Sequence, residues 1–323
     1  QLVGELKGLK FIVALTSKTL DTDIKSIKKA ARKGVAEELE KRVLSIMENK
    51  EIFLDENSKI IWKDNTIARL KKGNNYLNPD IEILADDSLD DFSKSKLETF
   101  LKNWIDTHIK EVLGDLLNLN KENVDNKYIR ALMFQLFENN GVIKRELVSE
   151  IVKSIKTEER KKIWSLGIKI GRYHIYLPKM LKPKAVALRI SLWRLFYQLA
   201  TNQDIPRSGL NYLIDKKYNK NFLLLCGFEK FKNHFVRIDI LEKLFIKILN
   251  KTEKRKFKID SEMINLIGCN KEGFYSLILS MNYKKSKEDE TYFYTGENKR
   301  KSKFINVNKN ENPFKKLLTL NLK

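Results

Sequence analysis

The sequence predicts a helix-rich α+β protein built from several small modules, some of them winged-helix-like, with no RecA-like parallel sheet. Three observations predict this class. Long segments with apolar residues every three or four positions alternate with short strand-like runs. Several helical segments precede a β-hairpin pattern at 166–177. Repeated strand–helix–strand units with phosphate-binding glycines, which a doubly wound parallel sheet of the nucleotide-hydrolysing kind carries, are not found in the sequence.

The chain has 323 residues, which is room for two or three domains of about 100–200 residues each. Changes of pattern along the chain divide it further. We expect a small α+β domain (1–85), a helical module with a basic, winged-helix-like hairpin (86–200), a mixed connecting region (201–260), a helix-turn-helix or winged-helix-like module (261–298) and a basic tail (299–323).

The first segment begins with a strand pattern at Leu9–Leu15, followed by a helix that Asp21 or Thr22 can cap. Short strands are expected at 52–54, 60–62 and 67–70, because turn residues separate these apolar runs.

Four clustered aspartates open the second segment: Asp86, Asp87, Asp90 and Asp91. Such a cluster can bind a hard cation. It also precedes a long amphipathic helix, where acids favour the positive end of the helix dipole, and we favour this capping role. Further helices are expected at Tyr128–Phe137 and Val142–Ile155.

The hairpin pattern at 166–177 contains two runs of alternating apolar residues on either side of Gly171 and Arg172. Pro178 ends the second strand, and Pro183 suits the first turn of a helix. A sheet with one buried face buries alternate residues, so we expect the hairpin side chains to divide into a core-facing set and a solvent-facing set. Ile168, Ile170, Ile175 and Leu177 should face the core, and Lys169, Arg172 and His174 should face solvent.

In the connecting region, 222–228 is expected to form a buried strand or core segment and 240–249 a helix. Ser261 can cap a short helix, Gly268 lies in the turn after it, and Lys271–Met281 forms the second helix. Helix, short glycine-containing turn, helix is the helix-turn-helix pattern.

A formal charge of +21 is the main bulk feature of the chain. An excess of Lys and Arg on this scale favours a polyanionic partner, above all nucleic acid. A membrane surface, an acidic protein, or a lysine excess without any ligand remain alternatives. Two cysteines are too few for a zinc site or a disulfide framework, and no apolar run approaches the roughly 20 residues of a membrane helix. We therefore expect a soluble cytoplasmic protein without a membrane partner, and a start at Gln1 suggests a fragment of a longer chain.

Basic and aromatic residues of the hairpin, the following helix and the helix-turn-helix pattern are the candidate nucleic-acid contacts. They are Lys169, Arg172, Tyr173, His174, Lys179, Lys182, Lys184, Arg189, Arg194, Lys271, Tyr275 and Lys284. Such residues clamp phosphates and stack on bases. His174 beside Arg172 and Tyr173 would also suit acid–base chemistry, but this cluster binds more often than it catalyses. The sequence contains no phosphate loop, DExH box, G-x-S-x-G or HExxH motif, so we assign no catalytic residue and no metal ligand.

Three runs resemble one family. LGIKIGRYHIYLPKMLKP at 166–183, MINLIGCNKEGFYSLILSMNYK at 263–284 and NPFKKLL at 312–318 are similar, in this order, to the accessory C-terminal half of alphaproteobacterial helicases. Those helicases are related to the mitochondrial degradosome-type DExH RNA helicases. In the family, two RecA-like motor domains hydrolyse ATP with Mg²⁺, and the accessory half guides the strand and aids duplex separation.

The resemblance implies that this chain holds no cofactor itself and that ATP and Mg²⁺ belong to the motor domains of a parent enzyme. It implies nucleic acid as a partner, with RNA favoured over DNA, and the motor domains as a second partner. Whether the chain is itself an enzyme stays open, although we expect no ATP hydrolysis from it alone. The alternatives are a helix-turn-helix DNA-binding regulator and a basic structural component of ribonucleoprotein particles.

Overall fold

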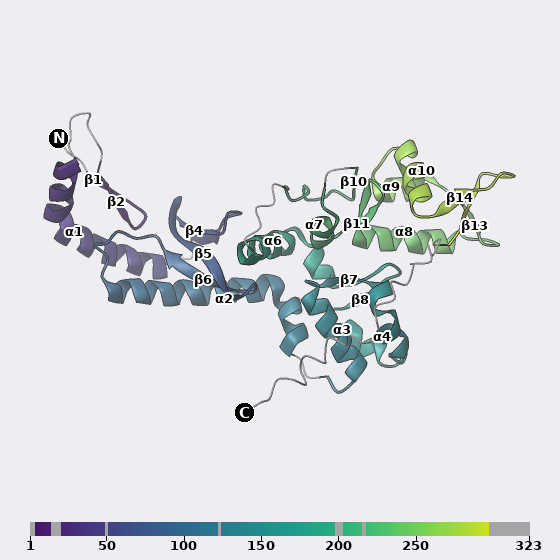
Figure 1. Cartoon of the computed structure of the whole chain (residues 1–323), viewed down its shortest axis with the longest axis horizontal. Coiled ribbons are helices and arrows are strands. Elements are labelled where there is room, and N and C mark those ends of the chain that lie inside the picture. The colour runs from purple at the N-terminus through teal and green to yellow at the C-terminus, as the bar shows by residue number, and fades with distance from the viewer. Residues whose placement is uncertain are drawn as a thin grey trace, which may run out of the picture. The chain divides into compact units, whose positions relative to one another are not determined.

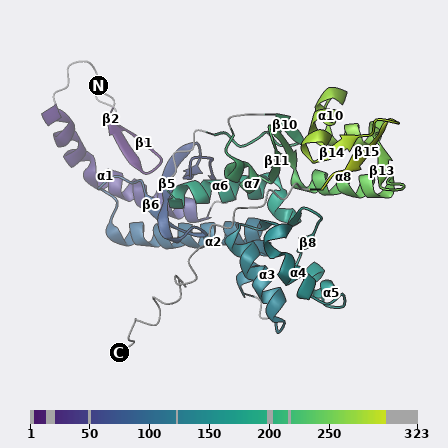
Figure 2. The same ribbon diagram turned by 45° about the vertical axis from the view of Figure 1, so that its right-hand side comes forward.

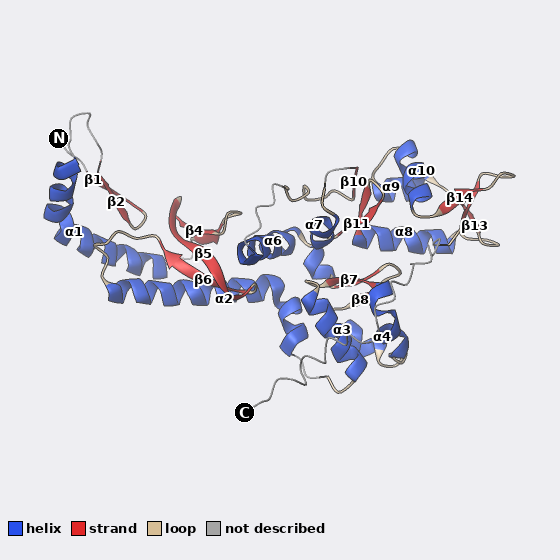
Figure 3. Ribbon diagram, in the orientation of Figure 1, coloured by secondary structure: helices blue, strands red, loops and turns tan. Residues whose placement is uncertain are grey.

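The structure is a computed structural model that describes residues 4–13, 21–48, 51–121, 124–197, 203–214 and 218–296. The chain divides into two compact units, Gln1–Phe245 and Ile246–Lys323. Helices dominate, and the described strands form small separate sheets in which every pair is antiparallel (Figures 1 and 3). The predicted helix-rich α+β class is therefore confirmed.

The N-terminal part of the first unit combines a hairpin, two long helices and a four-stranded sheet. Its elements are β1 (Gly4–Lys7), β2 (Lys10–Val13), α1 (Asp21–Glu48), β3 (Ile52–Leu54), β4 (Lys59–Trp62), β5 (Asn65–Asn75), β6 (Asn78–Ile83) and α2 (Asp91–Lys121). The sheet has the order β3-β4-β5-β6, and its strand β6 packs along α2 (Figure 1). Part of the predicted first strand, residues 14 and 15, lies outside the described residues.

The aspartate cluster caps α2, as expected. The Asp90 carboxylate accepts a hydrogen bond of 2.8 Å from the backbone N–H of Ser93, in the first turn of the helix. This bond and that from the Ser93 side chain hold the pKa of Asp90 below its usual value. Asp86 accepts from the N–H and the hydroxyl of Ser88 at 3.2 and 3.0 Å, so it closes the preceding turn.

A winged-helix-like arrangement follows. It consists of α3 (Lys127–Glu138), β7 (Val142–Lys144), the 3₁₀ turn η1 (Arg145–Val148), α4 (Ser149–Ser154), α5 (Arg160–Ser165), β8 (Lys169–Ile170) and β9 (His174–Tyr176). Its sheet has the order β7-β9-β8, and Figure 2 shows α3, α4 and α5 beside this sheet.

The helix predicted at Val142–Ile155 is wrong in its first half. Gly141, with φ +82°, ends the turn after α3 in a conformation that glycine adopts without strain. The β-branched residues Val142 and Ile143 then pair with β9 instead of continuing a helix.

The same order of elements recurs with one helix fewer. The 3₁₀ turn η2 (Pro178–Leu181) leads to α6 (Pro183–Tyr197), β10 (Tyr212–Ile214), α7 (Lys220–Leu225), β11 (Phe228–Phe231) and β12 (His234–Arg237), with the sheet order β10-β12-β11. The strand alternative predicted for 222–228 is wrong for every residue except Phe228, because 222–225 belong to α7 and 226–227 form the turn after it. Asn219 caps this helix by accepting from the N–H groups of Asn221 and Phe222 at 2.8 and 3.3 Å.

The third group comprises α8 (Ile238–Asn250), β13 (Lys256–Lys258), α9 (Ser261–Ile267), α10 (Lys271–Ser280), β14 (Tyr283–Lys285) and β15 (Thr291–Tyr294), with the sheet order β13-β15-β14. Helix α8 crosses the division between the units. Asp260, not Ser261, caps α9 by accepting from the N–H of Met263 at 2.8 Å. Gly268 ends α9 with φ +77°.

Phe257, Met263 and Phe274 are buried in the core of the C-terminal unit. The predicted basic tail, 299–323, lies outside the described residues. None of the described helices is long and apolar enough to cross a lipid bilayer.

Candidate nucleic-acid interface

The hairpin formed by β8 and β9 has the predicted inward face. Ile168, Ile175 and Leu177 are at most 2% exposed, and Ile170 packs half-buried against the same core. Lys169 and Arg172 are exposed, as predicted. The alternation of apolar residues therefore identified this face correctly.

The prediction that His174 faces solvent is wrong, because its side chain is 1% exposed. The face of the sheet that carries His174 also carries Tyr176 and Val142, and both belong to a second apolar cluster with Ile238. Leu224 of α7 packs against that cluster. The sheet is thus covered on both faces, whereas the prediction assumed that one face was open to water.

Glu229 of β11 holds the polar groups on this covered face. Its carboxylate accepts from Nζ of Lys144 at 2.8 Å and lies 2.7 Å from Nε2 of His174. Burial raises the pKa of the Glu229 carboxyl, but the hydrogen bonds from His174 and Lys144 outweigh burial and bring the pKa to about 2. A buried carboxylate with two such partners stabilises the fold only while it stays ionised.

A second buried carboxylate holds the wing, by which we mean residues 171–173 between β8 and β9. Glu242 of α8 accepts hydrogen bonds from the backbone N–H groups of Arg172, Tyr173 and His174, the last two at 2.8 and 3.0 Å. A Cβ atom on Gly171 would lie 2.3 to 2.6 Å from the carboxyl atoms of Glu242, so a larger residue there would displace the Glu242 carboxylate. The backbone of the wing therefore surrounds one carboxylate and donates hydrogen bonds to it.

The side chains of the wing pack on aromatic rings. Tyr173 is half-buried and makes edge-to-face contacts with Phe231 and Phe245, with ring centroids 6.0 and 5.7 Å apart. The guanidinium of Arg172 lies over the Phe245 ring, 5.4 Å from its centroid. Tyr173 is thus a packing residue here, and Arg172 keeps its exposed cation at the tip of the wing.

Arg189 of α6, predicted as a nucleic-acid contact, is fully buried. Its guanidinium donates to the backbone carbonyls of Asn140, Met180 and Leu225, the last two at 2.6 and 3.2 Å. These carbonyls lie just after α3, in η2 and at the end of α7, where helices leave acceptors unpaired. Burial lowers the pKa of Arg189 to about 10. Arg189 is therefore a structural residue, and it cannot contact a strand in this structure.

The other basic residues predicted around α6 differ in their exposure. Arg194 is half-buried, donates to the Gln203 carbonyl and lies 5.3 Å from the Phe222 ring centroid. Lys179 is exposed and pairs with Asp115 at 2.9 Å. Lys182 and Lys184 are exposed near the start of α6.

Helix α5 carries a basic and aromatic face that the sequence analysis missed. Arg160, Lys161 and Lys162 are exposed, and Trp164 is 68% exposed. Trp164 follows Arg160 by four positions and Lys161 by three, so the three side chains share one side of the helix. The inward residue is Ile163, which is fully buried. We call Arg160, Lys161 and Trp164 the α5 face, whereas Lys162 is two positions from Trp164 and points to another side of the helix. The run RKKIW directly before the hairpin was the available signal.

The predicted contacts in the C-terminal unit do not gather on one surface. Lys271 is exposed at the start of α10. Tyr275 stacks on Tyr292, with ring centroids 6.2 Å apart and the planes at 6°. Lys284 pairs with Phe293, the neighbour of Tyr292 in β15, and therefore points to the opposite face of the sheet.

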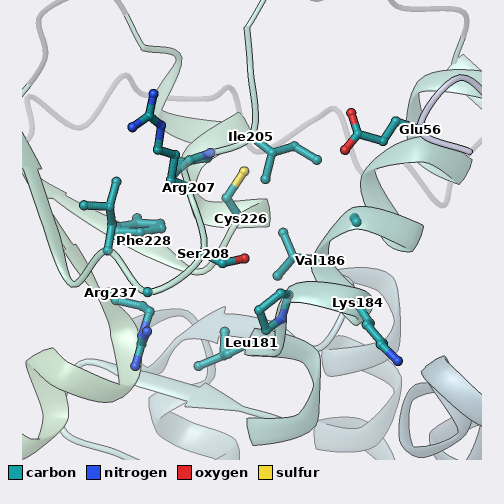
Figure 4. A pocket seen from close by; sticks show the side chains of 15 residues that line it. Glu56, Leu181, Lys184, Val186, Ile205, Arg207, Ser208, Cys226, Phe228 and Arg237 are labelled. Atoms are coloured by element: carbon teal, nitrogen blue, oxygen red, sulfur yellow. The ribbon is translucent and has the colours of Figure 1, made fainter.

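A cavity of about 440 Å³ lies between the start of α6, the loop at 205–210 and β11. Figure 4 shows Val186, Ile205 and Phe228 around an apolar interior, with the charged ends of Lys184 and Arg207 directed away from its centre. The thiol of Cys226 also lines it, and burial raises the pKa of this thiol to about 12. Such a thiol stays protonated at neutral pH and does not act as a nucleophile.

Comparison of the chain with family models, with curated proteins and with solved structures finds no match. Among the described residues, no group of three or more His, Cys, Asp or Glu side chains is placed to hold a metal ion.

Proposed function

We propose that this chain binds single-stranded nucleic acid, RNA in preference to DNA, as the accessory region of an ATP-dependent helicase. The observation that carries the proposal is the α5 face, with exposed Trp164 beside the two cations Arg160 and Lys161 and with exposed Lys169 and Arg172 on the hairpin that follows. Cations neutralise phosphates, and an exposed indole gives a base a surface to stack on.

The arrangement around α5 also suits nucleic acid. In helix-turn-helix proteins the second helix of the pair contacts the nucleic acid, and α5 has this position after α4. The link to a helicase rests on the resemblance of the three sequence runs, two of which fall on the β8–β9 hairpin with η2 and on α9, α10 and β14. The parent enzyme supplies the ATP site through its motor domains.

Binding of labelled single-stranded RNA and DNA to the whole chain tests the proposal. Affinity should fall steeply as salt rises, because Lys and Arg displace condensed counterions. Trp164→Ala should weaken binding by about tenfold, since stacking on an aromatic side chain contributes roughly 1–3 kcal/mol per base.

The matched control is Phe92→Ala on α2, an aromatic side chain that is 77% exposed and lies far from α5 in the sequence. It should leave affinity unchanged within about twofold. Equal losses in both variants, or affinity independent of salt, would contradict the proposal. The isolated chain should not hydrolyse ATP, and a stoichiometric Mg²⁺-dependent turnover that survives repurification would argue against the accessory role.

A further inference from the structure

A second cavity in the first unit is walled by aromatic side chains from three separate elements. Its volume is about 430 Å³, within the range of roughly 300–1,000 Å³ typical of small-molecule sites. Tyr76 comes from the turn between β5 and β6, Phe137 from the end of α3, and Trp193, Phe196 and Tyr197 from the end of α6. We call it the aromatic cavity.

The aromatic rings of α6 form a packed cluster that still reaches solvent. Tyr197 makes contacts with Phe196 and Trp193, with ring centroids 5.1 and 5.7 Å apart, and it remains 55% exposed. Contiguous aromatic side chains that are partly open to water beside a cavity are typical of ligand-binding grooves. The α6 cluster thus offers a rigid stacking surface.

Charged and amide groups surround these rings. Nζ of Lys72 lies over Phe196, 5.0 Å from the ring centroid, and Lys121 and Glu138 line the cavity. Asn75 and Asn120 also line it, and each amide carries both a donor and an acceptor. This combination matches the parts of a nucleotide. The aromatic rings suit its flat base, the amide groups suit the polar edge of the base, and the excess of cations, two against one carboxylate, suits its negative phosphate.

We propose that the aromatic cavity binds a base of a single-stranded nucleic acid, with the base stacked against Tyr197 and Trp193 and a neighbouring phosphate near Lys72. This inference rests on the proposed function and locates a second contact of the same strand, separate from the α5 face. Bases of a duplex are stacked inside it and cannot enter, so the cavity selects an unpaired strand.

The test compares Tyr197→Ala with Phe134→Ala, because Phe134 is 56% exposed on α3 and does not line the cavity. Tyr197→Ala should weaken binding of a labelled single-stranded RNA about fivefold or more, and Phe134→Ala by less than twofold. Both substitutions remove exposed rings, so both variants should melt close to wild type.

Photo-crosslinking gives an independent result. A single-stranded RNA that carries 5-iodouracil should form adducts with Trp193, Phe196 or Tyr197 upon irradiation of the wild-type chain. Absence of adducts at all the aromatic residues of the cavity, or equal affinities of the two variants, would overturn the inference while leaving the proposed function intact. Failure of the wild-type chain to bind any single strand would overturn both.

Discussion

The wings of the two winged-helix-like groups differ in the contacts that hold them in place. In the first unit the wing at 171–173 surrounds the Glu242 carboxylate, and the adjoining face of its sheet is covered by Glu229 and an apolar cluster. In the C-terminal unit the wing at 286–290 is charged, and four of its five residues are exposed. Two of its carboxylates form exposed ion pairs with lysines of neighbouring strands, Asp289 with Lys256 at 3.6 Å and Glu290 with Lys285 at 3.9 Å.

The two wings therefore differ in whether their residues are packed or exposed to solvent. The backbone and Tyr173 of the first wing are packed, and Arg172 is its exposed cation, beside Lys169 and the exposed cations of the α5 face. The second wing is free of such packing, but Glu288, Asp289 and Glu290 give it negative charge, which repels phosphates. Of the two groups, the first is the better candidate for binding nucleic acid.

The largest expected effect comes from Glu242→Gln. The neutral amide keeps one oxygen but turns an N–H₂ group toward backbone donors that need acceptors, so the free energy of unfolding should fall by about 2 kcal/mol. Urea unfolding measures the change. A variant as stable as wild type would show that the wing does not depend on its carboxylate.

Charge reversal should lower the affinity for single-stranded RNA more in the first winged-helix-like group than in the C-terminal one. Arg160→Glu with Lys161→Glu on α5 should lower affinity for single-stranded RNA about tenfold, roughly 1.4 kcal/mol, whereas Lys284→Glu with Lys287→Glu in the C-terminal unit should lower it much less. Fluorescence anisotropy at fixed salt gives both values. Similar losses would mean that only total charge matters.

The pH dependence of stability should reveal Glu229. Its pKa in the folded protein, about 2, lies below the ordinary value of 4.5, so its contribution is complete above about pH 4.5 and is lost as pH falls toward 2. Glu229→Gln should flatten the decline of the free energy of unfolding in this window, measured by urea unfolding, by an amount on the order of 1 kcal/mol.

Glu82→Gln is the control for this measurement. The pKa of Glu82 is also lowered to about 2, first by its hydrogen bonds with Arg69 and Lys71, but its side chain is 30% exposed and both partners are exposed, so solvent screens the interaction. Its replacement should change the pH profile little. An unchanged profile in the Glu229 variant would mean that its ion pairs do not stabilise the fold.

The smallest expected effect belongs to the C-terminal wing. Asp289→Asn removes an exposed partner of Lys256, so the free energy of unfolding should stay close to that of the wild type. A loss as large as that of Glu242→Gln would remove the contrast between the two wings.

Local patterns predicted much of this fold. The alternation around Ile175 fixed the inward face of the hairpin, and the glycine turn at 268 fixed the pair α9 and α10. Short apolar runs were ambiguous, because a strand and a buried helix turn share them, as in Phe222–Leu225. In that case the helix signal was the cap Asn219.

The candidate site was harder to predict, because burial depends on partners far away in the sequence. His174 meets Glu229, 55 positions later, and the three acceptors of Arg189 come from segments on both sides of it. The neighbouring residues in the sequence look the same for a buried basic side chain such as Arg189 as for a basic side chain on the surface. Trp164 was missed for the opposite reason, since a tryptophan is expected to be buried and this one is exposed.

Arg189 also has a kinetic consequence for the first unit. Its single guanidinium joins the ends of α3, η2 and α7 from a position on α6. When the Arg189 side chain moves out of this site, the three segments lose their hydrogen bonds to its guanidinium at the same time. The amide protons near these ends should therefore exchange with deuterium through one shared opening, and Arg189→Met should accelerate their exchange together.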